Sequence, residues 1–334
     1  MTISMIVETV VLVITIILAA LTTSSWTVAF FYLTMISIII LNSAAGVFQN
    51  LSYALAAQLP MRYTNAVMIG QNASGTAFAI ALLFSISAAP DQQASAITYF
   101  CIALFFMIIM FFLFQSVFRN RYYISVTGVA SDCGGSSSCE SFPADDAAAP
   151  LTPVQSIRKS WQLLAQCWTQ VLNAFLVYFV GLSIFPAIQV GVKSTDGILS
   201  DIYFTPVTCF FLFNVTALTG TIMTSGSIPI PGPRYLWIPV TLRILFIPFF
   251  LFCNYDPLGT RTLSVWFGRD WLYCLASALQ GLSLGYLGSL SVMYAPRIVA
   301  KEDSQAAGMM AGLACMLGMF TGVSTGFIWP AILT

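Results

Sequence analysis

An apolar stretch near the N-terminus carries amide and small side chains that could contact a solute. It covers residues 36–59 and reads ISIIILNSAAGVFQNLSYALAAQL. At helical spacing, one face of this stretch carries Asn42, Gly46, Gln49, Asn50 and Tyr53. Amides that face lipid would lack hydrogen-bond partners, at a cost of roughly 1 to several kcal/mol each. We therefore predict that this face meets protein or a water-filled path.

Two other regions combine amides with aromatic or small residues. Gln71 and Gly75 are four residues apart, as are Phe210 and Asn214, and Phe185-Pro186 is predicted to break a long helix. Such neutral groups suit an uncharged, planar, hydrogen-bonding solute, because amides match base and ribose edges and rings stack on a base. Contacts between membrane helices use the same residue types. Residue chemistry alone leaves both interpretations open.

Arg243 is a basic residue inside an apolar span, at a predicted depth of roughly 10 Å. Its guanidinium could extend to the membrane surface, or it could bond backbone carbonyls that Pro239 and Pro248 leave free. The alternative is a charge in a gate or pore. We include Asn42, Asn50 and Pro186 with Arg243 as candidate pore or gate positions.

Several classes of catalytic chemistry are excluded by composition. The chain has no histidine, which removes Ser-His and Cys-His nucleophilic pairs, imidazole bases and His metal ligands. Of the acidic residues only Glu8 is predicted to enter a span. Ion-coupled carriers usually keep a carboxylate at membrane depth, so the pattern favours uncoupled movement. We predict no enzyme activity, no cofactor and no metal site.

The composition is that of a polytopic membrane protein. Hydrophobic residues make up 58% of the 334 residues, charged residues 7%, and the mean hydropathy is +0.88. Soluble domains contain about 25% charged residues. The formal net charge is zero, so nothing suggests a nucleic acid as partner. We predict that the partners are the lipid bilayer and a small solute, and the oligomeric state is left open.

Runs of about 20 apolar residues predict nine membrane-spanning helices in an all-α fold. The predicted ranges are 4–22, 28–58, 64–88, 96–118, 162–190, 203–226, 236–254, 270–295 and 304–333. No Lys or Arg precedes Arg62, so the first range is read as a retained helix rather than a signal peptide. Lys and Arg favour the side of the loops at 59–63, 119–160 and 296–303, which predicts a cytoplasmic N-terminus and an extracellular C-terminus.

One long polar segment divides the predicted helices into two groups. Residues 1–118 would form an N-terminal bundle of four helices, and residues 161–334 a C-terminal bundle of five. The segment between them, 119–160, is rich in Ser, Gly, Ala and Asp and is predicted to be a disordered cytoplasmic linker. Cys133 and Cys139 within it give only a weak metal or redox signal.

Five stretches of the sequence resemble the equilibrative nucleoside transporter family. They are LNSAAGVFQNLSYALAAQLPMRYTNAVMIGQ (41–71), FPAIQVGVKS (185–194), CFFLFNV (209–215), LRILFIPFFLFCN (242–254) and GYLGSLSVMYAPRIVAKEDSQAAGMM (285–310). The resemblance runs over nearly the whole chain, with the motifs in family order. It implies a helical bundle related to the major facilitator fold, with six plus five helices. The present chain is similar to helices three to eleven of that bundle.

The resemblance also implies a function and a set of site residues. The implied function is facilitative passage of nucleosides, and of nucleobases in some members, across a membrane by alternating access. The plasma membrane is the implied location. By position in the motifs, the implied substrate contacts are Gln49, Gln71, Phe185, Phe210 and Asn214, with Pro186 beside the path.

The chain departs from the family pattern in ways that keep a second interpretation open. A family glycine linked to inhibitor sensitivity is Ala45 here, and a family Asp and Arg are replaced by Ala217 and Thr221. The alternative is therefore a truncated or diverged membrane protein that does not transport and acts as a binding or regulatory partner.

Overall fold

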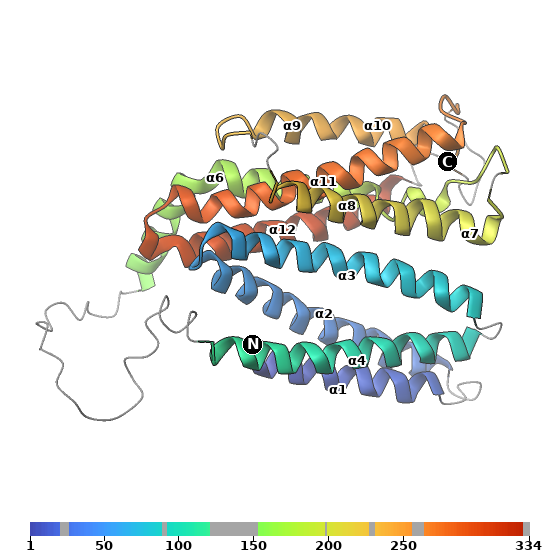
Figure 1. The fold of residues 1–334 in the computed structure, drawn as a ribbon, viewed down its shortest axis with the longest axis horizontal. Coiled ribbons are helices and arrows are strands. Elements are labelled where there is room, and N and C mark those ends of the chain that lie inside the picture. The colour runs from blue at the N-terminus through green and yellow to red at the C-terminus, as the bar shows by residue number, and fades with distance from the viewer. Residues whose placement is uncertain are drawn as a thin grey trace, which may run out of the picture.

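Long helices run back and forth along one axis of the molecule (Figure 1). The computed structural model describes residues 1–20, 27–88, 92–120, 153–197, 199–226, 231–255 and 264–329. The first group of helices comprises α1 (Thr2–Ala20), α2 (Thr27–Ala57), α3 (Met61–Ala88) and α4 (Gln92–Phe118). Because the turns between them are short, neighbours in sequence lie antiparallel.

The second group contains both straight and interrupted helices. Its members are α6 (Pro153–Ile184), the short η2 (Gln189–Gly191), α7 (Asp201–Thr205), η3 (Pro206–Phe211), α8 (Leu212–Met223), α9 (Trp237–Leu242), η4 (Arg243–Leu245), α10 (Phe246–Leu251), α11 (Asp270–Ile298), η5 (Lys301–Asp303) and α12 (Ser304–Gly326). The segments α7, η3 and α8 follow one another without a break, as do α9, η4 and α10. Within the described residues the two groups therefore make nine helical passes.

The prediction of an all-α membrane bundle is confirmed. Seven helices in the described part of the chain are long and apolar enough to cross a membrane. The run from α9 to α10 is apolar but shorter, and α11 is long but more polar. α11 carries Gln280, Ser289 and Ser291, all of which are buried. The face of α11 that carries them is therefore covered by protein, and these polar groups bond other helices or turns of α11 itself, while Trp271, Leu275 and Leu279 are exposed.

Prolines set two of the helix boundaries. α6 ends at Ile184, immediately before the predicted break at Phe185-Pro186. α6 begins at Pro153, inside the segment 119–160 that was predicted to be a linker. Proline suits a first helical position, since its missing N–H would have no partner there. Residues 121–152, with Cys133 and Cys139, lie outside the described residues, and the linker and the division into two bundles remain predictions.

Basic residues gather at one end of the bundle, which we call the basic end. On the described segments they are Arg62, Arg119, Arg158, Lys159, Arg234, Arg297 and Lys301. The antiparallel order explains why these residues lie together. α2, α4, α8 and α11 end at the basic end, and α3, α6, α9 and α12 begin there (Figure 1). An ion pair between Lys159 Nζ and Asp303 Oδ1, at 2.9 Å, links α6 to η5 here.

α2 and α12, which belong to different groups of helices, lie closest together at the basic end. A Cβ added to Gly308 of α12 would lie 2.5 Å from Ala57 Cβ of α2, which requires nearly touching backbones. Further along the same helices, a Cβ added to Gly46 would lie 3.9 Å from Met316 Sδ. Figure 1 shows α2 diverging from α12 toward the opposite end. The helices therefore meet at a close contact at one end and separate toward the other.

A second close contact joins α8 to α11. A Cβ added to Gly285 would lie 1.8 Å from the Ala217 carbonyl oxygen and 2.9 Å from Thr221 Oγ1. Glycine allows the two backbones to approach, as small residues do at membrane helix contacts.

We expect Gly285→Ala to lower the free energy of unfolding by about 1–3 kcal/mol, because a methyl group must force the α8 backbone away. Thermal unfolding of the purified protein in detergent measures this. Gly268→Ala is the matched control, since its added Cβ would lie 3.7 Å from Val265 Cγ1, an ordinary contact. Equal stability of the two variants would contradict the close packing of α8 on α11.

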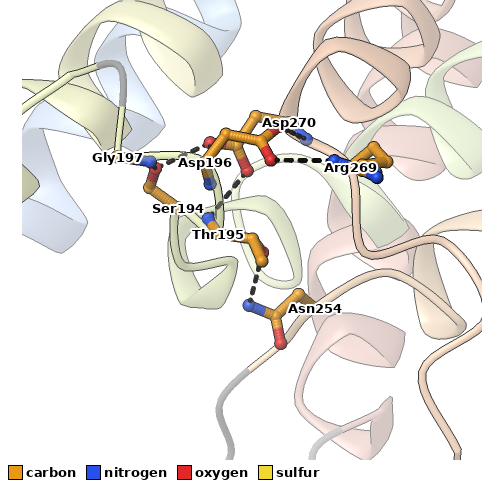
Figure 2. Close-up of polar contacts among 7 residues, drawn as sticks. All are labelled: Ser194, Thr195, Asp196, Gly197, Asn254, Arg269 and Asp270. Carbon is orange, nitrogen blue, oxygen red and sulfur yellow. Dashed lines mark hydrogen bonds and ion pairs between the residues drawn. The ribbon is translucent and has the colours of Figure 1, made fainter.

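A polar cluster ties three loops together at the end opposite the basic end (Figure 2). Asp270, the first residue of α11, accepts hydrogen bonds from Ser194 Oγ at 2.6 Å, Thr195 N at 2.9 Å and Asp196 N at 3.1 Å. Asn254 Nδ2 donates to the Lys193 carbonyl at 3.1 Å. The cluster therefore joins three parts of the chain: the loop after α6, the segment after α10 that holds Asn254, and the start of α11.

Asp270 gives this cluster a pH dependence. Burial by itself would raise the pKa of the Asp270 carboxyl, but the bonds from Ser194, Thr195 and Asp196 outweigh it and hold the pKa below its ordinary value. A depressed pKa means that the charged form stabilises the folded state. This stabilisation is present above the ordinary aspartate pKa of about 3.9 and is lost as the pH falls through the folded-state value.

We expect Asp270→Asn to lower thermal stability at pH 7 and to flatten the loss of stability below about pH 4. Unfolding temperatures measured between pH 3 and pH 7 for both proteins test this. Asp196→Asn serves as the control, because the Asp196 carboxylate accepts two longer contacts, from Arg269 Nη1 at 3.5 Å and from Asp270 N at 3.3 Å. Parallel pH profiles for wild type and Asp270→Asn would contradict the assignment.

Candidate functional site

Gln49 and Gln71 are joined by a shared tyrosine. Gln49 Nε2 of α2 donates to Tyr53 Oη at 3.2 Å, and Tyr53 Oη donates to Gln71 Oε1 of α3. Tyr53 is 1% exposed, so this relay lies inside the protein. The relay leaves Gln49 Oε1 and Gln71 Nε2 at its two ends. These atoms are one acceptor and one donor, the pair needed to complement the edge of a base.

Phe185 and Phe210 lie together on the other group of helices. Their ring centroids are 5.7 Å apart in an edge-to-face arrangement. Phe185 also stacks on Phe213, with centroids 4.2 Å apart and an interplanar angle of 7°. Phe213 belongs to the same buried cluster as Tyr53, and Phe185 packs against that cluster. The aromatic group and the amide relay therefore adjoin one core.

Asn214 lies where α8 meets α3. Its Nδ2 donates to the Phe210 carbonyl at 2.8 Å, and a Cβ added to Gly75 would lie 2.3 Å from its Oδ1. The side chain is half-buried. Gly75 is one helical turn beyond Gln71, so Asn214 lies on the α3 face that leads to the relay. The structure thus joins Gln49 and Gln71 through Tyr53, and it joins Phe185, Phe210 and Asn214 through ring and backbone contacts, with Asn214 lying against Gly75 of α3.

The other predicted positions are dispersed. Asn42 is exposed, and its Nδ2 donates to the Ile38 carbonyl of its own helix at 2.8 Å. Asn50 faces α12, because a Cβ added to Gly312 would lie 2.4 Å from its Oδ1. Pro186 lies in the turn after α6. The amides of the opening stretch therefore do not share one environment: Asn42 faces outward, Asn50 faces α12, and Gln49 joins the relay.

Arg243 lies within the bundle and does not extend to the membrane surface. It is 2% exposed, and its Nε, Nη1 and Nη2 have no hydrogen-bond partner among the described residues. A Cβ added to Gly181 of α6 would lie 3.6 Å from Nη2, so the guanidinium points at α6. The structure therefore does not show either of two expectations from the sequence. The guanidinium neither extends to the membrane surface nor bonds the carbonyls that Pro239 and Pro248 leave free.

Thr221 makes contacts between helices, although it was not among the predicted site residues. Its Oγ1 accepts a hydrogen bond from Asn72 Nδ2 of α3 at 2.8 Å and one from Ser289 Oγ of α11 at 3.2 Å, and it lies 3.1 Å from the Gly285 carbonyl. The residue is fully buried. A signal was present, since Thr221 continues the Phe210, Asn214 and Ala217 face at helical spacing.

Further neutral hydrogen bonds cross between the helix groups near the basic end, among them one from Asn65 Nδ2 to Ser225 Oγ. Thr224 Oγ1 donates to Asn65 Oδ1 at 2.8 Å, and Gln58 Nε2 donates to Gln305 Oε1 at 2.8 Å. With Asn72 and Thr221 they form what we call the polar seal. At the opposite end, Ser87 Oγ and Tyr203 Oη lie 3.4 Å apart on the exposed surface. The ion pairs Lys159–Asp303 and Arg269–Asp196 each lie within the second group of helices.

The described residues contain no group of three or more His, Cys, Asp or Glu side chains that could hold a metal ion. What the site offers is neutral hydrogen bonding and aromatic stacking.

Comparisons with known proteins agree with this chemistry. The family model described as nucleoside transporter matches residues 35–331. The chain is 32% identical over 322 residues to equilibrative nucleoside transporter 3 of Rattus norvegicus, covering 92% of this chain and 66% of the relative. It is 28% identical to equilibrative nucleoside transporter 2 of Homo sapiens, covering 91% and 73%, and 28% identical to human equilibrative nucleoside transporter 1, covering 91% and 70%.

These matches confirm the expected transporter, as opposed to an enzyme, and the multi-pass membrane location. The chain spans about two thirds of the length of these relatives. The matched residues include most of α2, all of α3 and the chain from α6 to α12, which hold the relay, the aromatic group and the polar seal. This chain therefore belongs to the nucleoside transporter family.

Proposed function

We propose that the protein carries nucleosides, and also nucleobases, across a membrane down their gradient. The observation that carries the proposal is the Gln49, Tyr53 and Gln71 relay adjoining Phe185 and Phe210. The relay ends supply a donor and an acceptor for a base edge, and the rings supply a stacking surface. No carboxylate takes part in it. A solute bound by such groups needs no coupled ion, which fits equilibrative transport.

The mechanism that we propose is alternating access between two bundles, residues 1–118 and 161–334. Gln49, Gln71, Phe185, Phe210 and Asn214 would contact the substrate between them. The polar seal and the α2 to α12 contact would close the site at the basic end. The solute would enter from the other end, toward which α2 diverges from α12 (Figure 1). Closure of the opposite end and opening of the basic end would then release the solute on the other side of the membrane.

The basic end is proposed to face the cytoplasm, because Lys and Arg near helix ends are retained on that side. This orientation gives a cytoplasmic N-terminus, an extracellular C-terminus and, as the proposed location, the plasma membrane. Access of a protease or a thiol reagent to the segment between α4 and α6 tests this orientation. We expect the segment to react in opened cells and to be protected in intact cells.

Uptake of labelled uridine and adenine into proteoliposomes tests the transport activity. We expect saturable uptake that stops when internal and external concentrations are equal, with no change when a proton or sodium gradient is imposed. Accumulation above the external concentration would contradict uncoupled transport. Absence of saturable uptake of either solute by well-folded protein would favour the alternative, a non-transporting partner protein.

A further inference from the structure

We propose that a groove between α6 and α9 binds an anionic phospholipid of the leaflet at the basic end. The groove has a volume of about 600 Å³. Its lining includes Trp168, Gln170 and Asn173 of α6, with Arg234 and Trp237 at the start of α9. The site is separate from the proposed substrate path, whose five contact residues do not line this groove.

Tryptophans place the groove at the membrane interface. Trp168 is 56% exposed and Trp237 is 51% exposed; Trp237 is the first residue of α9, and Trp168, near the middle of α6, lines the same groove. Indole rings prefer the headgroup level, where an apolar ring and a polar N–H can both be accommodated. Leu172 and Leu176 continue the lining further along α6. The groove thus offers an apolar path for an acyl chain below a ring of interfacial groups.

Arg234 supplies the charge that selects an anionic headgroup. It is exposed and lies in the loop before α9, at the mouth of the groove. A guanidinium matches phosphate and carboxylate oxygens with paired donors. The other basic residues of the same end add to the positive potential. Among the residues that line the groove there is no carboxylate to compete for Arg234.

Buried amides hold the wall of the groove in place. Gln170, 1% exposed, donates through Nε2 to the Pro233 carbonyl at 2.8 Å, and Asn173, 2% exposed, lies 3.5 Å from Gln170 Oε1. Tyr294 Oη of α11 donates to the Pro231 carbonyl at 3.0 Å. Two helices therefore fix the loop that carries Arg234, which makes the groove a formed site before any lipid binds.

Quenching of tryptophan fluorescence by brominated lipids tests the proposal. The full chain is placed in phosphatidylcholine nanodiscs with a minor fraction of either dibrominated phosphatidylserine or dibrominated phosphatidylcholine. Since one basic residue near a membrane surface contributes about a fivefold preference for anionic lipid, we expect apparent association about fivefold stronger for the serine lipid. Trp168→Phe with Trp237→Phe should remove this difference, because those indoles report on the groove.

Two charge variants separate the groove from the general surface potential. Arg234→Gln should reduce the preference to near unity, whereas Arg62→Gln, which removes one charge from α3 at the same end, should retain it. Equal quenching by both lipids would overturn the proposal, as would equal effects of the two variants. Loss of the preference in millimolar inorganic phosphate would also overturn it, since that result indicates a site for free phosphate rather than lipid.

Discussion

Replacing Tyr53 by Phe should raise the KM for uridine uptake by about tenfold. The hydroxyl accepts from Gln49 and donates to Gln71, so its removal breaks both bonds of the relay at once. A hydrogen bond contributes about 0.5–1.5 kcal/mol net, and 1.4 kcal/mol corresponds to a tenfold change in binding. Both glutamines would then lose the orientation that presents their free atoms to the base.

Initial rates of uridine uptake into proteoliposomes, measured over a range of concentrations, give KM and the maximal rate separately. Tyr294→Phe is the matched control, because its hydroxyl bonds the Pro231 carbonyl away from the relay. We expect its KM to be unchanged. A KM for Tyr53→Phe within twofold of wild type would show that the relay only packs α2 against α3 and does not contact substrate.

Gly308→Ala should change the balance between the two access states. The added methyl would lie 2.5 Å from Ala57 Cβ and 3.1 Å from the Tyr53 carbonyl, and neither atom belongs to a flexible side-chain end. Overpacking of this kind costs about 1–3 kcal/mol. Because the cost falls only on the state that is closed at the basic end, the equilibrium should shift about 5- to 150-fold toward opening there.

Thiol labelling measures this shift. Thr224 is 5% exposed within the polar seal, so a Thr224→Cys reporter should react slowly with a water-soluble maleimide when the basic end is closed. We expect faster labelling with Gly308→Ala and no change with Gly46→Ala, whose added Cβ would lie 3.9 Å from Met316 Sδ. Equal labelling rates of Thr224→Cys with and without Gly308→Ala would mean that the α2 to α12 contact does not differ between the two access states.

The neutral seal also bears on the two family residues that this chain lacks. The sequence resemblance implies a family Asp and Arg at the positions of Ala217 and Thr221, and both positions are buried where α8 packs on α11. An isolated charge at either position would be costly to bury, whereas loss of both together leaves no unpaired partner. Thr221 instead receives Asn72 from α3. The replacement therefore keeps a contact between the helix groups by means of uncharged groups.

The sequence by itself determined the class of protein and most of its helices. Apolar runs of spanning length require helices in a bilayer, since only a helix satisfies its own backbone groups there. Helix ends followed from local signals, such as the stop of α6 before Phe185-Pro186. The amide and aromatic residue types indicated a neutral solute, and the motifs indicated the family.

Only the tertiary structure decided which amides act together. Asn42, Gln49 and Asn50 have the same chemistry and helical spacing, yet one faces outward, one joins Tyr53 and one meets α12. Helical periodicity gives the direction of a side chain around its own axis but not which neighbour lies in that direction. That neighbour depends on helix tilt and close approach, which glycines such as Gly308 and Gly285 permit through contacts far apart in sequence.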